Sequence, residues 1–421
     1  MLNAVQQEIK QDKQIKKFCA YGFLKDLKFF DPYLLIFLMS KGLSLFQIGI
    51  LISIREITIN IFEIPSGFIA DYFGRKKEMY FSFFFYIISF FFFFLTSSFL
   101  TAIIAMVLFG LGEAFRSGTH KAMIYTYLDK KGWRSEKTFV YGRTRSFSLI
   151  GNAFSSIIAI ILILTVPSTN IIFLFSIIPY ALDFILIITY PSFLDISDKK
   201  KNLTFSMLFK NFIKGFRKNK TLRQILIEGG IFDSTVSFVK DLIQPILELI
   251  IVGTGAVLLS SLTPEDNLNI ILGIVYCVLN ILGSFASKKA YIVKKGKTNI
   301  KCLSIMHIIL TICLAILIFV SKSSILVFIV YLFIYALFNV RKPIFVDEIE
   351  EHIEKEQRST IFSISSQLKS LFLMVLSPFL GFLADKYSFS AVMLVLSLIF
   401  VATLPLLINK KNKKGTIAKK G

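Results

Sequence analysis

Acidic and basic residues stand inside several long apolar stretches of this 421-residue chain. Asp31 lies near the middle of one stretch, Arg55 and Glu56 in the next, and Glu113 and Arg116 in a later one. An ionisable group at membrane depth costs at least about 2.5–3.5 kcal/mol on insertion scales, so it normally faces a cavity or a partner of opposite charge. Such carboxyl groups can exchange protons, whereas an arginine stays charged.

Polar residues also recur at helical spacing in these stretches. Asp233, Ser237, Lys240, Gln244 and Glu248 follow one another at steps of three and four, which places them in one stripe of a helix. Shorter stripes are Glu56, Asn60 and Glu63, and Arg145, Ser148 and Asn152. Stripes on several helices predict a polar cavity near the membrane midplane. The residues predicted to line it are Arg55, Arg116, Asn152, Asp233, Lys240, Asp241 and Tyr335.

The same charges allow a second interpretation. Glu113–Arg116, Arg55–Glu56 and Lys240–Asp241 could be internal ion pairs that hold helices in register and contact no solute. For Glu63 and Glu248, which lie near helix ends, this structural interpretation is the favoured one.

Asp31, Glu56 and Glu113 are the candidates for proton binding. Asp31 leads, because Pro32 follows it and a proline in a membrane helix frees a backbone carbonyl that needs another partner. A flexible point beside an acid suits proton coupling, although Asp31 could instead only stabilise a kink. His120, seven residues after Glu113 and expected on the same face, is a further proton carrier candidate.

These residues lie on about twelve apolar segments. Hydrophobic residues make up 55% of the chain and Phe alone numbers 46, and many runs approach the roughly 20 residues that cross a bilayer. The predicted spans are 19–41, 44–70, 79–99, 101–128, 139–164, 171–190, 222–252, 268–287, 299–320, 324–346, 360–384 and 390–408. The expected fold is an all-α membrane protein with a bundle of six helices at 1–190, a linker at 191–221 and a second bundle of six with a short basic tail at 222–421.

The chain has a net charge of +21, and its basic residues lie mainly in the loops between the predicted spans. Basic residues gather in alternate loops, on the side of both termini, which predicts cytoplasmic termini in an inner (plasma) membrane. This distribution does not favour nucleic acid as a partner. Residues 203–221 alternate Phe and Lys at helical spacing and are expected to lie on the anionic inner leaflet. The polar, Lys-rich first twenty residues do not resemble a cleaved signal peptide.

Enzymatic chemistry is not expected. The four cysteines, Cys19, Cys277, Cys302 and Cys313, lack metal-ligand spacing and are interpreted as reduced helix residues. The sequence offers no His-rich metal set, no nucleophile with a base and no phosphate-binding loop, so neither a metal nor a cofactor is predicted.

A motif at the end of the second span carries a family resemblance. The chain reads Gly67-Phe68-Ile69-Ala70-Asp71-Tyr72-Phe73-Gly74-Arg75-Lys76-Lys77, which resembles the signature loop of the major facilitator superfamily. Gly67 permits close helix approach, Gly74 a tight turn, and Asp71 can face a helix N-terminus or an arginine. We expect Gly67, Asp71, Gly74 and Arg75 to form a conformational latch.

Two look-alikes accompany this motif. The segment 283–287 has the same spacing with Ser287 in place of the acid, as a degenerate second copy. The segment 381–385 ends on Asp385 but falls on the outer side of the predicted topology, so it cannot be the same cytoplasmic latch.

The resemblance implies a monomeric secondary transporter that moves a small polar or charged solute by alternating access, coupled to protons. Multidrug or amphiphile efflux by proton antiport is the alternative, although 151–156 lacks the Gly-Pro pattern of many drug antiporters of the family. A non-transporting sensor on the same fold is the alternative of a different class. The identity of the substrate is not readable from the residues.

Overall fold

The computed structural model describes residues 4–195, 219–254, 261–294, 296–320, 324–353 and 358–408, and these residues are overwhelmingly helical. The predicted leaflet-bound segment at 203–221 falls almost wholly outside them. The described residues fall into two compact units, which share several long helices.

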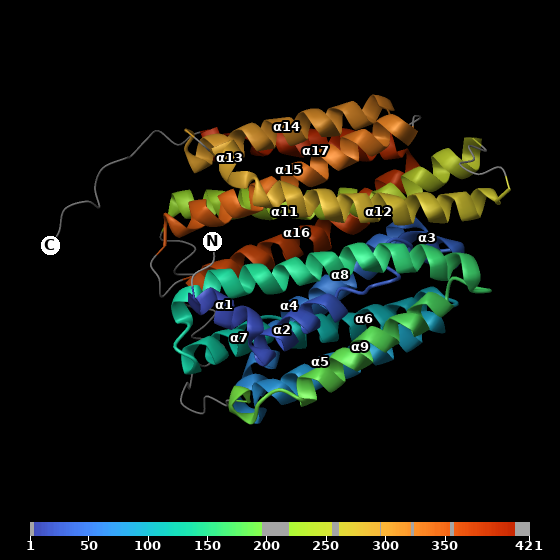
Figure 1. Cartoon of the computed structure of the whole chain (residues 1–421). Helices are drawn as coiled ribbons and strands as arrows, with labels where there is room; N and C mark the ends of the chain where they lie inside the picture. Colours follow the sequence, from blue (N-terminus) through green and yellow to red (C-terminus); the bar gives the residue numbers. More distant parts are fainter. Residues whose placement is uncertain are drawn as a thin grey trace. The chain divides into compact units, whose positions relative to one another are not determined.

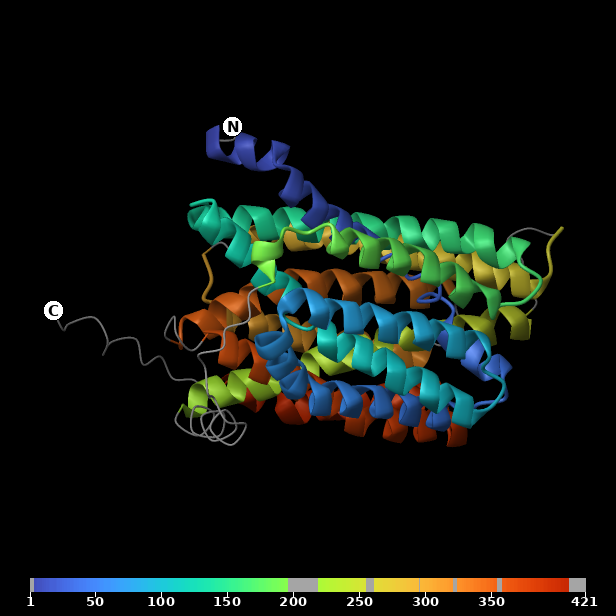
Figure 2. The same cartoon turned by 90° about the horizontal axis from the view of Figure 1, so that it is seen from below.

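Unit 1 comprises residues 1–202, 241–284 and 373–386. Its helices are α1 (Ala4–Gln11), α2 (Lys13–Leu24), α3 (Leu34–Ser40), α4 (Leu45–Phe73), α5 (Arg75–Phe94), α6 (Phe99–Arg116), α7 (Thr119–Lys130), α8 (Lys137–Thr165) and α9 (Ile171–Ile188), with short turns η1 (Arg134–Glu136) and η2 (Ser192–Leu194). The axes of the long helices α5, α6, α8 and α9 are roughly aligned, as Figure 1 shows and as their colours let the reader follow in Figure 2.

Unit 2 comprises residues 203–240, 285–372 and 387–421. Its own helices are α13 (Ala290–Lys294), α14 (Asn299–Val320), α15 (Ser324–Glu350), α17 (Phe389–Thr403) and α18 (Pro405–Ile408). Three further helices, α11 (Lys220–Thr254), α12 (Pro264–Lys288) and α16 (Arg358–Lys386), contribute residues to both units.

Ten helical stretches in the described residues are long and apolar enough to cross a membrane. They match ten of the predicted spans, and the other two differ from an uninterrupted apolar helix. The first predicted span is divided between α2 and α3, and the seventh, α11, carries too many charges. Large apolar side chains such as Phe84, Phe154 and Ile185 are more than half exposed, as expected of surfaces that face lipid. The prediction of an all-α membrane protein of about twelve spans is confirmed.

Small residues set the close packing of unit 1. Ser82 of α5 donates a hydrogen bond to the carbonyl of Gly112 in α6 at 2.7 Å, and Ser89 donates to that of Ala105 at 2.9 Å. A β-carbon at Gly112 would lie 2.8 Å from the ring of Tyr86. Close backbone approach and interhelical hydrogen bonds are what hold helices together where water does not drive association.

Candidate functional site

The first predicted span is interrupted where Asp31 and Pro32 lie. Helix α2 ends at Leu24 and α3 begins at Leu34, so the prediction of one continuous helix over 19–41 is wrong. Because proline cannot donate the helical hydrogen bond, the segment needs other partners. Gln244 of α11 supplies them: its Nε2 donates to the Asp31 carbonyl at 3.0 Å, and its Oε1 accepts from the Leu35 amide at 2.8 Å.

A second contact holds the same segment. The Tyr33 hydroxyl, almost fully buried, donates to the carbonyl of Asn269 in α12 at 3.0 Å. The interruption is therefore stabilised by side chains from two other helices. Irregular backbone at membrane depth is tolerated where it is buried in protein or lines a cavity.

The interrupted segment forms one wall of a cavity of about 240 Å³ in unit 1. Helices α4, α5 and α6 supply the rest of the lining. The lining residues are Lys28, Phe30, Asp31, Leu34, Arg55, Glu56, Ile59, Phe93, Met106, Phe109 and Glu113. The structure thus brings together all three predicted proton-binding candidates and Arg55, and it adds Lys28, which was not among the predicted cavity residues.

Ion pairs connect the charged residues of this cavity. Arg55 Nη2 lies 2.8 Å from Glu56 Oε1, and Lys28 Nζ lies 3.6 Å from Glu113 Oε1. Arg116 also pairs closely with Glu113, and its Nε donates to the Tyr86 hydroxyl at 3.0 Å. We call Lys28, Asp31, Arg55, Glu56, Glu113 and Arg116 the cavity cluster. The charged side chains of its ion pairs are 10–26% exposed, so they remain open to a solute.

Of the seven predicted cavity residues, Arg55 lines this cavity and the other six do not: Arg116, Asn152, Asp233, Lys240, Asp241 and Tyr335. Asn152 lies on α8, Lys240 and Asp241 lie on α11, and Tyr335 lies on α15, all of them half-buried. Of these, Asp241 is close enough to Arg55 to act on it electrostatically. Their proposed contact with a solute stays a prediction.

The residues of the polar stripe of α11 have different partners along the helix. Asp233 pairs with Arg341 in unit 2, and Gln244 holds the interrupted helix in unit 1. Glu248 lines a second cavity of about 450 Å³, together with Glu265. Helical spacing placed these residues on one face correctly, but a helix of 35 residues passes several neighbours along its length.

At the signature loop, the structure describes the turn and its partners. Gly74 has a φ of +100°, which favours glycine, and it separates α4 from α5. The Asp195 carboxylate accepts from the Lys76 amide at 2.8 Å, and Arg75 donates to Thr126 at 2.7 Å. For Gly67 and Asp71 only the helical backbone is described, so the latch stays a prediction. Asp195 is an acid at a helix N-terminus that the sequence reasoning missed.

The outer look-alike has a defined contact. Asp385 of α16 accepts from the backbone amides of Leu45 at 3.0 Å and Phe46 at 2.7 Å, at the start of α4. A β-carbon at Gly381 would lie 2.3 Å from the Leu45 carbonyl oxygen, so glycine is needed for this approach. The carboxylate satisfies amides that have no partner within their own helix.

His120 is separated from the cavity by a helix break. Helix α6 ends at Arg116 and α7 begins at Thr119, with a φ of +77° at Gly118. The prediction that His120 continues the face of Glu113 is therefore wrong. Its ring stacks on Tyr21 with centroids 3.5 Å apart, and its Nε2 lies 3.1 Å from the Tyr190 hydroxyl.

Unit 2 contains a second set of charges, of which the sequence reasoning named only Asp233. We call Glu228, Asp233, His307 and Arg341 the buried cluster. Arg341 Nη2 lies 2.5 Å from Glu228 Oε2, and Arg341 Nη1 lies 3.3 Å from Asp233 Oδ1. His307 Nδ1 lies 3.0 Å from Glu228 Oε1. Membrane depth was the available signal, because Glu228, His307 and Arg341 all lie within predicted spans.

Comparison with known proteins identifies the family of this chain. Residues 25–368 match the family model described as Major Facilitator Superfamily. The chain is 31% identical over 104 residues to the uncharacterized MFS-type transporter YxaM of Bacillus subtilis (strain 168), and the match covers 24% of this chain and only about a quarter (26%) of that relative.

Solved transporter structures are similar in fold. A nucleoside transporter, NupG, has a TM-score of 0.76 at 10% identity, with 94% of this chain and 99% of that chain covered. A POT family transporter in complex with a thioalcohol-conjugated peptide scores 0.73 at 11% identity over 94% and 96%. A D-xylose-proton symporter scores 0.68 at 13% identity over 96% and 98%. Since the family model covers most of its length, the chain belongs to the Major Facilitator Superfamily.

Proposed function

We propose that this transporter moves a small charged or zwitterionic solute by alternating access, coupled to protons, and that the solute binds at the cavity cluster. The observation that carries the proposal is the lining of the 240 Å³ cavity, which presents Lys28 and Arg55 together with Asp31, Glu56 and Glu113. A volume just below the usual range of ligand pockets suits a small metabolite.

The charges favour a solute that carries charge itself. Glu113 already pairs with Arg116 and Lys28, and Glu56 with Arg55. A zwitterion can replace these contacts one for one, because its cationic group meets a carboxylate while its anionic group meets Arg55 or Lys28. A neutral solute offers no such exchange for the desolvated charges.

The interrupted first helix supports alternating access. In secondary transporters, substrate sites near the midplane are typically formed by discontinuous helices. Here Lys28, Phe30 and Asp31 reach the cavity from the segment between α2 and α3. Asp31 is our leading residue for proton coupling, since it combines a cavity position with a backbone that side chains, not a regular helix, hold in place.

The similar structures do not determine the solute. Their names describe transporters of nucleosides, peptides and D-xylose, and at 10–13% identity they share the fold with this chain. The charges of this chain's own cavity therefore carry the proposal on solute class.

Amphiphile efflux by proton antiport is the second candidate. Phe30, Phe93, Met106 and Phe109 form an apolar part of the same lining, which could accommodate a lipophilic cation. A sensor on this fold would bind a solute at the same place without moving it.

Flux measurements in proteoliposomes distinguish these candidates. The purified chain is tested with amino acids, dipeptides, nucleosides, sugars and lipophilic cations, with and without an imposed pH gradient. We expect a charged or zwitterionic solute to accumulate when the gradient is present. Transport of lipophilic cations alone would favour efflux, and saturable binding without any flux would favour a sensor.

A matched variant checks that loss of charge alone is not the cause of an effect. Asp129 lies outside the cavity and pairs with Arg134 at 2.7 Å, with both side chains about half exposed. Exposed pairs of this kind contribute little to stability. Asp129→Asn should therefore transport like the wild type.

We place the protein in the plasma membrane as a monomer, with both termini cytoplasmic and residues 203–221 on anionic lipid. The distribution of basic loops supports this topology. Labelling of single cysteines from outside should modify positions 97 and 168 and spare position 131. Strong labelling at 131 by an impermeant reagent would overturn it.

A further inference from the structure

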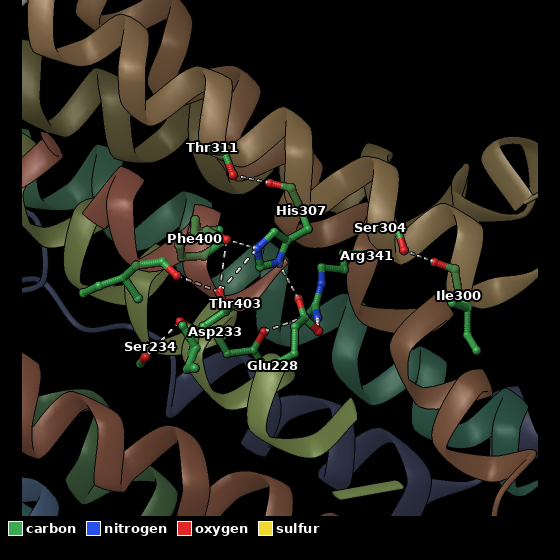
Figure 3. A network of polar contacts seen from close by, with 12 residues as sticks. Glu228, Asp233, Ser234, Ile300, Ser304, His307, Thr311, Arg341, Phe400 and Thr403 are labelled. Atoms are coloured by element: carbon green, nitrogen blue, oxygen red, sulfur yellow. Dashed lines mark hydrogen bonds and ion pairs between the residues drawn. The ribbon is translucent and has the colours of Figure 1, made fainter. Parts of the chain in front are cut away.

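Figure 3 shows the side chains of the buried cluster, Glu228, Asp233, His307 and Arg341, gathered in one network of polar contacts in unit 2. Glu228 and His307 are 0% exposed and Arg341 is 1% exposed. The Arg341 guanidinium lies 3.9 Å from the centre of the Phe232 ring, and the His307 ring stacks on Phe400 with centroids 4.6 Å apart. Neither of the two cavities described above is lined by a residue of this cluster, and its protons are held by its own hydrogen bonds.

The hydrogen bond at His307 Nε2 fixes one proton. Nε2 lies 2.9 Å from the backbone carbonyl oxygen of Phe400, and a carbonyl can only accept. The Thr403 hydroxyl, at 3.5 Å from Nε2, does not change this, since it donates to the Ile399 carbonyl at 2.9 Å. Nε2 therefore carries a hydrogen.

The other ring nitrogen faces an acid. His307 Nδ1 lies 3.0 Å from Glu228 Oε1. This contact needs a hydrogen, which comes either from Nδ1 of an imidazolium or from a protonated Glu228 carboxyl group. In both cases the two residues together hold one proton more than a neutral imidazole and a carboxylate would hold. Arg341, bound to Oε2 of Glu228, favours the imidazolium form because it stabilises the carboxylate.

We propose that His307 and Glu228 form a proton-binding site in unit 2 that holds one exchangeable proton in this conformation. Its surroundings balance the charge. Helix α11 supplies Glu228 and Asp233, α15 supplies Arg341, and α14 supplies His307, while the described part of α17 presents the Phe400 carbonyl and the Thr403 hydroxyl. With the imidazolium, two positive groups meet two carboxylates.

Loss of this proton breaks a helix contact. A neutral His307 either turns a lone pair on Nδ1 towards the Glu228 carboxylate or a lone pair on Nε2 towards the Phe400 carbonyl, and both arrangements are repulsive. Helix α14 must then lose its hydrogen bond to α11 or to α17. Helix α11 also carries Gln244, which holds the interrupted helix beside the solute cavity. Protonation of unit 2 can thus act on a helix that the proposed solute site uses, and only this last step rests on the proposed function.

The proton can be observed directly. The chain contains three histidines, so ¹⁵N-histidine labelling of the full protein in lipid nanodiscs gives few signals, and His307→Gln assigns the one of interest. At neutral pH we expect both ring nitrogens of His307 to carry hydrogens. In the other form of the site, a neutral His307 is accompanied by the infrared carbonyl band of a protonated acid that Glu228→Gln removes. A neutral His307 without such a band would overturn the proposal.

Variants test the partner and exclude misfolding as the cause. In Glu228→Gln, His307 should carry a hydrogen on one ring nitrogen only, because no carboxylate remains to share the second. Asp233→Asn, which keeps the Glu228 contact, should retain the proton. His352, whose Nδ1 lies 3.6 Å from Glu348, provides the matched pair, and Glu348→Gln should leave the His307 signals unchanged. If all variants leave the state of His307 unchanged, Glu228 is not its partner and the proposal fails.

Transport measurements separate this site from the proposed function. His307→Gln should lose pH-driven accumulation of solute while exchange of solute across the membrane continues. A protonated His307 in a protein that shows no pH-driven transport would leave the site standing and refute the coupling. Proton-driven transport with a neutral His307 and an ionised Glu228 would refute the proton-binding site and leave the proton coupling of transport standing.

Discussion

The cavity cluster and the buried cluster use the same residue types in opposite settings. Each joins carboxylates to an arginine within membrane helices. In the cavity cluster the charged side chains of the ion pairs are 10–26% exposed. Glu228, His307 and Arg341 of the buried cluster are 0–1% exposed, and only its fourth member, Asp233, is 17% exposed. Accessible pairs can exchange partners with a solute, whereas a buried charge depends on its protein partners for compensation.

This difference divides the expected consequences of mutation. Removing a charge from the buried cluster leaves its partner buried without compensation, which costs stability. Removing a charge from the accessible set leaves a partner that water or solute can reach, so the loss falls mainly on transport. Variants that remove the same group from each cluster therefore test the comparison directly.

The largest effect is expected for Arg341→Met. It leaves Glu228 and Asp233 without their shared cation and should lower the free energy of unfolding by about 3–5 kcal/mol, the cost of breaking a buried pair. Arg116→Met, the matched change in the cavity cluster, should cost clearly less. The measurement is denaturant unfolding of both variants in mixed micelles. Equal losses would show that burial does not distinguish the two clusters.

Glu113→Gln should affect the rate of transport more than the stability of the fold. Both Arg116 and Lys28 lose their carboxylate at the cavity wall, so the initial rate of solute transport should fall at least about tenfold, which corresponds to 1.36 kcal/mol of transition-state stabilisation. Stability should change less than in Arg341→Met. Glu136→Gln is the control, since Glu136 lies outside the cavity and accepts a hydrogen bond from Gln6 at 2.9 Å. Wild-type flux in Glu113→Gln would remove this residue from the site.

Asp31→Asn should abolish the coupling of transport to protons but leave movement of the solute across the membrane intact. Without a carboxyl group at the interrupted helix, accumulation against a gradient should be lost, while exchange continues because it needs no net proton transfer. Asp31→Glu keeps the carboxyl group and should retain part of the coupling. Solute flux in vesicles with and without an imposed pH gradient measures both. Undiminished accumulation in Asp31→Asn would move the proton-binding role to Glu56, Glu113 or the buried cluster.

The sequence predicted the spans well because hydrophobic length is a local property. It also placed Asp31, Glu56 and Glu113 at one depth, and the structure brings them to one cavity. Depth could be inferred from each segment separately, without knowledge of how the helices pack. The signature motif added the family, which the comparison confirmed.

Partners across helices were not predictable in the same way. The pairing of Glu228 with His307 and Arg341 joins residues 79 and 113 positions apart, and no spacing rule within one helix reaches them. The role of Gln244 depended on an interruption that Pro32 signalled only as a kink. His120 was misplaced because α6 ends at Arg116 and a new helix begins after Gly118, whereas the sequence pattern predicted one continuous helix.

Asp385 tests the smallest effect, since this acid belongs to neither cluster. Its carboxylate binds the Leu45 and Phe46 amides at the start of α4, so Asp385→Ala should cost about 1 kcal/mol, as for loss of a helix N-cap. Asp385→Asn keeps an acceptor oxygen and should lose only part of that. Asp266→Ala is the control, because Asp266 accepts a hydrogen bond from Thr263 at the start of its own helix, at 2.7 Å. Unfolding in mixed micelles compares the three. A loss in Asp385→Ala as large as that in Arg341→Met would mean that contacts between α4 and α16 contribute as much to the free energy of unfolding as the buried ion pairs. The contrast between the two clusters would then no longer explain which contacts stabilise the protein.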